Sequence, residues 1–272
     1  MNYQLLANLE NWLGQQIVGQ QDLIHKLMLA LLADGHLLVE GAPGLAKTRA
    51  IKEMAEGIEG SFHRIQFTPD LLPGDITGTD IFRPQTGAFE FQQGPIFNNL
   101  VLADEINRAP AKVQSALLEA MAERQVSIGS QTYELPPLFL VMATQNPIEQ
   151  EGTYPLPEAQ LDRFLMHVRV SYPDAGAEQA ILRLARNEAG GSRSRPEGTV
   201  SQADIFSARK AVLDIHMAPA VEEYIIQLIV GTREPDHYDS ELAGWLEYGA
   251  SPRATIALDR CARANAWIAG RD

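Results

Sequence analysis

The chain has 272 residues, of which 45% are hydrophobic and 21% charged, and its formal net charge is -13. These values exclude a disordered or fibrous protein, and the length favours two unequal domains. The negative charge disfavours non-specific binding to nucleic acid or to anionic membranes. The only cysteine in the sequence, Cys261, excludes an intramolecular disulfide and a multi-cysteine zinc site.

The N-terminal segment MNYQLLANLENWL has no basic stretch ahead of an apolar one, as a secretory signal would. No uncharged apolar run approaches the roughly 18 residues that a membrane-spanning helix needs. We therefore expect a cytoplasmic protein without membrane insertion.

Apolar spacing predicts two N-terminal helices, one around Leu5 to Leu13 and one over 20–33. The segment HLLVEG at 36–41 predicts a short buried strand, and 46–58 predicts the helix after it. Further strands are expected at 62–68, 99–104, 138–144 and 164–170, with a helix at 111–125. Nearly continuous apolar strands that alternate with helices favour a parallel sheet covered on both faces, so the expected class is α/β.

Two segments of alternating residues predict β-hairpins outside this sheet. One, at about 75–95, turns at Pro84 to Gly87, and the other, at about 123–137, turns near Gly129.

Beyond residue 172 the strand signals stop, and we place a domain boundary near Pro173. The expected domains are an α/β domain over 1–172 and a smaller all-α domain over 173–272. The predicted helices of the second domain are 177–186, 201–213, 219–231 and 252–269, with a linker at 187–199. The last helix reaches the end of the chain without a clear stop signal, which is typical of a chain shortened at its C-terminus.

A glycine-rich segment, GAPGLAKT, lies between the first predicted strand and its helix. It departs from the phosphate-binding loop G-x-x-x-x-G-K-[ST] only at Ala46. In such a loop, backbone N–H groups surround phosphate, a lysine neutralises phosphate oxygens and a hydroxyl binds Mg²⁺. Lys47 and Thr48 supply the last two groups. We expect Ala46 to fit only with a negative φ and its methyl group directed away from the phosphates. The candidate binding residues are Gly41, Ala42, Pro43, Gly44, Leu45, Ala46, Lys47 and Thr48.

Two later strands end in polar side chains. NLVLADEIN ends in Asp104 and Glu105, at the place where ligands bind in open α/β sheets. Asp104 is suited to hold the Mg²⁺ shell, and Glu105 to polarise water for in-line attack on a γ-phosphate. LFLVMATQNP ends near Asn146, whose amide is able to orient water and the γ-phosphate together. A turn asparagine before Pro147 is the alternative.

Six motifs in this order, IVGQ, GAPGLAKT, VLADEINRAP, MATQNP, PLPEAQLDRF and GASPRA, resemble the MoxR family of AAA+ ATPases over essentially the whole chain. The resemblance implies a P-loop AAA+ core with a helical lid, in which the loop is the Walker A motif and Asp104 with Glu105 the Walker B motif. Minichromosome maintenance helicases of the same clade also carry alanine at the position of Ala46, which implies a working loop. The two hairpins match inserts that tend to face a central pore, and ordinary edge hairpins are the alternative.

The resemblance also gives roles to residues outside the loop. Arg163 in QLDRF matches the arginine finger, which reaches the γ-phosphate of a neighbouring subunit, and Arg253 in GASPRA matches the sensor 2 arginine of the lid. A guanidinium stabilises charge on a transferring phosphoryl group, whereas a surface ion pair is the alternative for each. Gly19 in IVGQ matches a segment that contacts adenine, or else forms a turn between helices. Arg108 matches a position at the subunit interface, with a solvated helix start as the alternative.

The leading hypothesis is a Mg-ATP hydrolase that assembles into a homo-oligomeric, hexameric ring and remodels a protein client. ATP and Mg²⁺ are the expected cofactors, with Thr48 and Asp104 on the metal side. The resemblance further implies a partner with a von Willebrand factor A domain, and a chaperone-like role in maturing protein complexes or inserting metal cofactors.

Two other classes stay open. A DNA-dependent motor shares this core, but the net acidity and the lack of an appended DNA-binding segment disfavour it, so no nucleic acid partner is expected. A nucleotide-gated scaffold without turnover usually lacks the catalytic acid or the finger, and both Glu105 and Arg163 are present. A GTPase is disfavoured because no NKxD-type segment occurs in the sequence.

Overall fold

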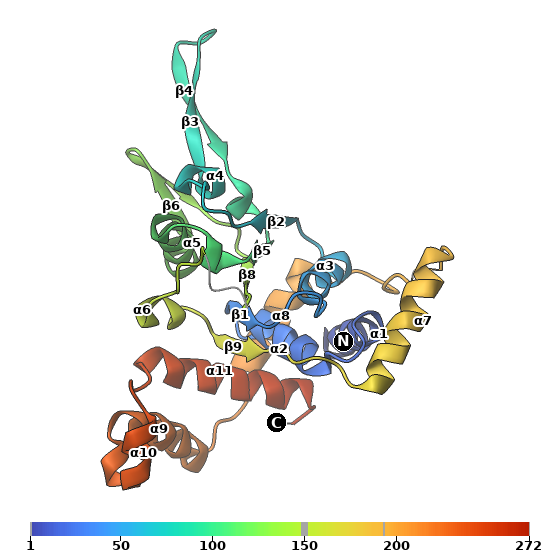
Figure 1. Ribbon diagram of the computed structural model, residues 1–272, viewed down its shortest axis with the longest axis vertical. Coiled ribbons are helices and arrows are strands. Elements are labelled where there is room, and N and C mark those ends of the chain that lie inside the picture. Colours follow the sequence, from blue (N-terminus) through green and yellow to red (C-terminus); the bar gives the residue numbers. More distant parts are fainter. Residues whose placement is uncertain (1, 148–151, 193, 272) are drawn as a thin grey trace.

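The computed structural model describes residues 2–147, 152–192 and 194–271. A central sheet lies between helices, two hairpins extend from one end of the molecule, and the last helices lie at the other end (Figure 1). Among the described residues, the sheet has five strands in the order β2-β5-β8-β1-β9, all parallel. The expected α/β class with a parallel sheet is thus confirmed. The strands are β1 Leu37–Glu40, β2 Phe62–Gln66, β5 Leu100–Asp104, β8 Leu140–Gln145 and β9 Met166–Arg169.

Helices cover both faces of this sheet. Those of the first part are α1 Asn2–Gln16, α2 Gln21–Leu32, α3 Lys47–Gly57, α4 Pro73–Thr77 and α5 Ala111–Glu123. Successive strand residues belong to opposite hydrophobic cores, because side chains alternate along a strand: Leu37 and Val39 pack into one core and Leu38 into the other. The first core also contains residues of α1, α2 and α3, and the second contains residues of α5. Burial on both faces explains why these strands have nearly uninterrupted apolar sequences.

The two predicted hairpins form, with their turns where the sequence places them. They consist of β3 Gly78–Arg83 with β4 Ala88–Gln93, and of β6 Gln125–Ile128 with β7 Gln131–Glu134. Phe91 of the first stacks on Tyr133 of the second, with 3.9 Å between ring centroids. Near the far end of the first hairpin, Phe82 and Phe89 are 50% and 71% exposed. The hairpins therefore support each other at the base and leave aromatic side chains exposed beyond it.

In the described residues after Pro173 the regular structure is helical, apart from a bridge between Ile58 and Val200. Its helices are α7 Ala175–Ala189, α8 Gln202–Leu213, α9 Pro219–Arg233, α10 Ser240–Trp245 and α11 Pro252–Ile268, and α6 Glu158–Leu161 precedes β9. The helix α7 is longer than predicted and takes up the start of the proposed linker, whose Arg193 lies outside the described residues.

The C-terminal helices divide between two locations. Ile205, Ala208 and Val212 of α8 and Ala264 of α11 lie in the first core, whereas α9 and α10 lie farther from the sheet (Figure 1). The last helix does have a stop signal, contrary to the sequence interpretation. Gly270 has a φ of +64°, and Arg271 N–H donates to Ala266 O at 2.9 Å, which is a glycine-based helix end. The boundary near Pro173 stays a prediction.

Within the described ranges, no helix combines the length and the apolar character needed to cross a bilayer.

A buried histidine lies where α2 turns into β1. His36 is 5% exposed, packs edge-on against Phe139, and accepts a hydrogen bond at Nδ1 from Val141 N–H at 3.0 Å. Burial, helped by the nearby Arg124 guanidinium, lowers the pKa of His36 to about 3. The imidazole is therefore neutral in the native protein at pH values where the unfolded chain already binds a proton.

We predict that the stability of the protein falls as the pH drops from 6.5 toward 3, by up to about 1.4 kcal/mol per pH unit for this one group. The sign follows because the depressed pKa of His36 makes the unfolded state the better proton binder in that window. Urea unfolding at pH 7, 6 and 5 measures the slope. The variant His36→Asn keeps an acceptor but cannot titrate, so its slope should be shallower; equal slopes would contradict this account.

Candidate nucleotide site

The glycine-rich loop joins the carboxyl end of β1 to the first residue of α3, as the sequence predicts. Lys47 is 9% exposed and folds back over the loop: its Nζ donates to Gly41 O and, at 3.4 Å, to Gln145 O. Burial lowers the pKa of Lys47, while Asp104 and Glu105 act in the opposite direction. A phosphate group would replace the carbonyl oxygens as partner of this ammonium and restore the charge balance of the site.

Ala46 adopts the conformation that the sequence interpretation excluded. Its φ is +58° and its ψ is 14°, in the left-handed region, so the expectation of a negative φ was wrong. The turn into α3 imposes this geometry, because Ala46 is the N-cap residue and Ala50 N–H already donates to its carbonyl at 2.9 Å. Glycine would adopt this φ without strain, whereas alanine is held there at a cost of roughly 1 kcal/mol.

The two acids at the end of β5 are held by a threonine of the adjacent strand β8. Thr144 Oγ1 donates to Asp104 Oδ1 at 2.6 Å and accepts from Glu105 N–H at 2.9 Å. Glu105 itself has a φ of +58°, which turns its side chain out of the strand direction. One hydroxyl thus holds both the carboxylate of Asp104 and the backbone of Glu105, the residues that are predicted to serve the metal ion and the water.

Two residues of β2 complete the acidic cluster, and the sequence interpretation missed both. Arg64 donates to Asp104 Oδ2 from Nε at 3.0 Å and from Nη2 at 2.7 Å. Gln66 Nε2 donates to Glu105 Oε2 at 2.9 Å, and Arg108 donates to the same oxygen at 3.2 Å. No sequence signal marked them, because Arg64 and Gln66 are exposed residues on one side of an edge strand, and only its pairing with β5 brings them to the acids.

These groups line one cleft of about 410 Å³. Lys47, Thr48, Asp104, Glu105 and Asn146 all contribute to its wall, so the structure brings together the residues predicted for the phosphates, the metal ion and the water. The fit to Mg²⁺ is chemically sound, because a threonine hydroxyl and a carboxylate are the hard oxygen ligands that this ion prefers. Asn146 is 7% exposed, which favours a fixed amide over a solvated turn.

A second cavity, of about 240 Å³, lies on the other side of the same loop. Apolar groups from the IVGQ segment, from the loop and from α7 line it, among them Ile17, Leu45 and Leu184. We call it the apolar slot. Gly19 does not line the slot, although Val18 and Gln20 do. Instead Gly19 has a φ of +80° and lies against α7, where a Cβ would come within 2.9 Å of Ala177 Cβ and 3.0 Å of Pro173 Cβ.

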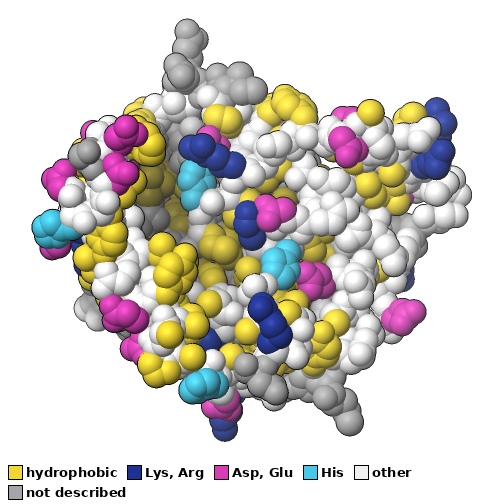
Figure 2. Space-filling view, turned by 90° about the horizontal axis from the view of Figure 1, so that it is seen from below, with side chains coloured by type: hydrophobic (Ala, Val, Ile, Leu, Met, Phe, Trp, Pro, Cys, Tyr) yellow, Lys and Arg dark blue, Asp and Glu magenta, His cyan; other side chains and the backbone are white. Residues whose placement is uncertain are grey.

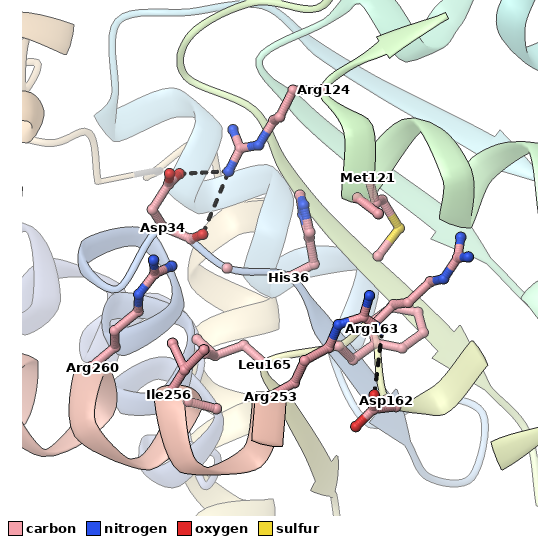
Figure 3. Close-up of a pocket in the computed structure, with 14 residues that line it drawn as sticks. Asp34, His36, Met121, Arg124, Asp162, Arg163, Leu165, Arg253, Ile256 and Arg260 are labelled. Atoms are coloured by element: carbon pink, nitrogen blue, oxygen red, sulfur yellow. Dashed lines mark hydrogen bonds and ion pairs between the residues drawn. The ribbon is translucent and has the colours of Figure 1, made fainter. Parts of the chain in front are cut away.

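The two predicted catalytic arginines lie elsewhere. Arg163 precedes β9, and the parallel pairing of β9 with β1 places it at the amino edge of the sheet, opposite the loop. Arg253, in the first turn of α11, reaches toward Asp162, with 3.3 Å between Nη1 and Oδ2 (Figure 3). Both line a pocket of about 360 Å³ that does not include the loop. Among the described residues, the Arg163 side chain has no hydrogen bond or ion pair.

The surroundings of these arginines are basic. The pocket wall also includes Arg124 and Arg260, opposed by Asp34 and Asp162. Arg124 is already paired with Asp34 at 2.7 Å. Figure 2 shows the molecule from the side of α11, where hydrophobic side chains surround a hollow and Lys or Arg side chains lie beside it. The face is therefore suited to an anionic group that does not come from this chain's own loop.

Comparison with known proteins agrees with this arrangement. Residues 36–166 match the ATPase family associated with various cellular activities (AAA), and residues 243–272 match an AAA lid domain. Chaperone MoxR1 of Mycobacterium tuberculosis is 46% identical over 94% of this chain and 67% of its own length. Protein YeaC of Bacillus subtilis is 43% identical over 98% of this chain and 81% of its own length.

The chain belongs to the MoxR family of AAA+ ATPases. The Methylorubrum extorquens protein MoxR is 32% identical over 98% of this chain and 81% of its length. The crystal structure of a candidate ATPase from Cytophaga hutchinsonii has a TM-score of 0.88 at 44% identity, and the match covers 99% of this chain and 82% of that one. The P-loop core and helical lid expected from the motifs are thereby confirmed.

We predict that Ala46→Gly stabilises the protein by about 0.5 to 1 kcal/mol, because it releases the left-handed strain at a modest cost in unfolded-chain entropy. Ala55→Gly, in the last turn of α3, is the matched control and should destabilise by up to about 1 kcal/mol. Urea unfolding without nucleotide measures both. Equal destabilisation by the two substitutions would contradict the strain at Ala46.

Proposed function

We propose that this MoxR-family protein hydrolyses Mg-ATP in a site shared by two copies of the chain. The observation that carries the proposal is the position of Arg163 and Arg253 at the sheet edge opposite their own phosphate-binding loop. An arginine finger supplied by a second molecule accounts for that position, and it couples hydrolysis to assembly. A closed ring fits this head-to-tail contact, and the hexamer stays our proposal for its size.

Each residue of the cleft has a role in this proposal. Lys47 and the amides of the loop hold the β- and γ-phosphates, while Thr48 and Asp104 hold Mg²⁺, which neutralises charge that develops on the phosphates. Glu105, kept in place by Gln66 and Thr144, accepts a proton from the attacking water. Asn146 orients that water. Arg163 and Arg253 of the neighbouring molecule stabilise the charge on the transferring phosphoryl group.

Arg64 must release Asp104 when nucleotide binds. In the structure the Arg64 guanidinium donates two hydrogen bonds to Asp104 Oδ2, whereas Thr144 donates to the other oxygen, Oδ1. A Mg²⁺ ion held by Asp104 would supply a stronger positive charge to that carboxylate, and Arg64, which also lines the cleft, would then turn toward phosphate. Arg64 thus balances the charge of the acidic pair until the metal ion is present.

We further propose a chaperone-like role in the assembly of protein complexes in the cytoplasm, with a von Willebrand factor A domain protein as partner. The name Chaperone MoxR1 of the mycobacterial relative supports the general role. Client contact is assigned to the first hairpin, because Phe82 and Phe89 are exposed near its turn and pair with each other at 5.4 Å. Exposed aromatic side chains on a projecting hairpin favour contact with apolar segments of a partly unfolded protein.

We predict that Glu105→Gln leaves ATP binding intact and lowers turnover by about a hundredfold or more, because the amide cannot accept the proton from water. Isothermal calorimetry with Mg-ATP measures binding, and phosphate release measures turnover. Turnover at the parent rate would rule out Glu105 as the base. Binding without turnover in the parent itself would identify a nucleotide-gated scaffold.

We predict that Arg163→Ala and Glu105→Gln, each nearly inactive alone, recover activity when mixed. Each interface then has a chance of pairing an intact Glu105 with an intact Arg163, so activity should approach about a quarter of the parent value if the copies assemble at random. Phosphate release after mixing and re-equilibration is the readout. A mixture no more active than its components would show that each chain works with its own arginine.

A further inference from the structure

The apolar slot lies on the other side of the loop from the cleft that contains Lys47 and Thr48, which we call the phosphate cleft. Pro43, Gly44, Leu45, Ala46 and Arg49 line both cavities, so the two cavities adjoin at the loop. The slot is mostly apolar, and its exposed rim includes Tyr172 at 70% and Ile181 at 37% exposure. On the basis of the proposed function, the slot holds the base of the nucleotide whose phosphates lie in the cleft.

One polar group in the slot is unexplained by the fold. Gln16, the last residue of α1, lines the slot and is only 3% exposed. Its Oε1 has no hydrogen-bond partner among the described residues. A buried amide oxygen without a partner costs roughly 1 to 3 kcal/mol, so such a group needs a reason to be there. The oxygen itself is fully buried, so a ligand that donates a hydrogen bond would supply such a reason once the side chain turns Oε1 toward the slot.

Gln20, the other glutamine at this cavity, has a hydrogen-bond partner. Gln20 also lines the slot and is 8% exposed, but its Nε2 donates to Ser171 O at 3.1 Å and ties the IVGQ segment to the end of β9. Two glutamines thus lie at the same cavity, one engaged in holding the segment and one with an unused acceptor.

We propose that Gln16 recognises the base of the nucleotide by accepting a hydrogen bond at Oε1 from the exocyclic 6-amino group of adenine. A glutamine amide is complementary to adenine because it offers an acceptor for the amino group and a donor for a ring nitrogen. Apolar groups around it exclude water, so the hydrogen bond contributes more to selectivity than it would in solvent. Gln16 is then a specificity-determining residue, and the cost of leaving its oxygen unpaired is removed on ATP binding.

Gln16 also has a possible structural role, which is to pair with another side chain of α1. Trp12 Nε1, one turn earlier on α1, also lacks a partner, and the two residues are four apart on the same helix. A donor and an acceptor at that spacing are neighbours on the helix surface, so a small side-chain shift would pair them. In that case Gln16 would stabilise α1 and have no influence on which base binds.

The test compares ATP with purine riboside 5′-triphosphate, which lacks only the 6-amino group, by calorimetry in the Glu105→Gln background so that neither is hydrolysed. With Gln16 present, ATP should bind about three- to tenfold more tightly than the analogue, as one hydrogen bond in a buried site provides. Gln16→Met keeps the length and removes the amide, so the two nucleotides should bind within about twofold of each other. Gln15→Met, at an exposed glutamine of the same helix that does not line the slot, is the matched control, and its preference for ATP should equal that of the parent.

Thermal unfolding without nucleotide tests whether Gln16 has a structural role. Removing an unpaired acceptor should leave the melting temperature of Gln16→Met unchanged or higher. An unchanged preference for ATP in Gln16→Met, or a preference lost equally in Gln15→Met, would overturn the proposal. So would a lower melting temperature with unchanged preference, which identifies a structural bond to Trp12. If ATP itself gave no binding heat with the parent chain, the proposed function would fail instead.

Discussion

The parallel sheet dictates where the chemistry of this protein lies. All five strands of the described sheet run in one direction, so segments that follow strands gather at one edge and segments that precede them gather at the other. The loop after β1, the acids after β5 and Asn146 after β8 therefore converge, whereas Arg163 before β9 does not. A single chain consequently holds the phosphate cleft and the arginines of the same predicted reaction at opposite edges.

The helix α7 lines the apolar slot and also contacts the helix that follows the phosphate-binding loop. Glu188 near its end pairs with Arg49 of α3 through both carboxylate oxygens, one of them at 3.1 Å from Nη1. At its start, Ala177 lies against Gly19, whose missing side chain permits the close approach. Because these contacts hold α7 over the slot from both ends, any movement of the helix changes the walls of the slot and the position of Arg49, the residue next to Thr48, together. We therefore expect nucleotide binding to depend on the position of α7.

Much of the fold was predictable from the sequence. Periodicity located the strands of the sheet, the long helices and both hairpins, because apolar burial on two faces leaves an unmistakable pattern, as in NLVLAD and LFLVMAT. The short elements α4, α6 and α10 were not anticipated, since four to six residues are too few to show a period.

Within the site, local motifs were more informative than long-range partners. The loop and the acids are contiguous in sequence, so their convergence could be inferred. The φ of Ala46 could not, because the conformation follows from the turn into α3 and not from the side chain. Arg64 and Gln66 were missed since only the pairing of β2 with β5 brings them to Asp104 and Glu105. The position of Arg253 beside Asp162 likewise depends on how α11 packs.

The central claim is that hydrolysis requires two copies of the chain, and its most direct test is phosphate release per chain over a range of protein concentrations, with the assembly state measured by sedimentation in Mg-ATP. A shared site predicts that the rate per chain rises with the fraction of assembled protein and levels off when assembly is complete. A constant rate per chain at concentrations where the protein sediments as a monomer would contradict the account.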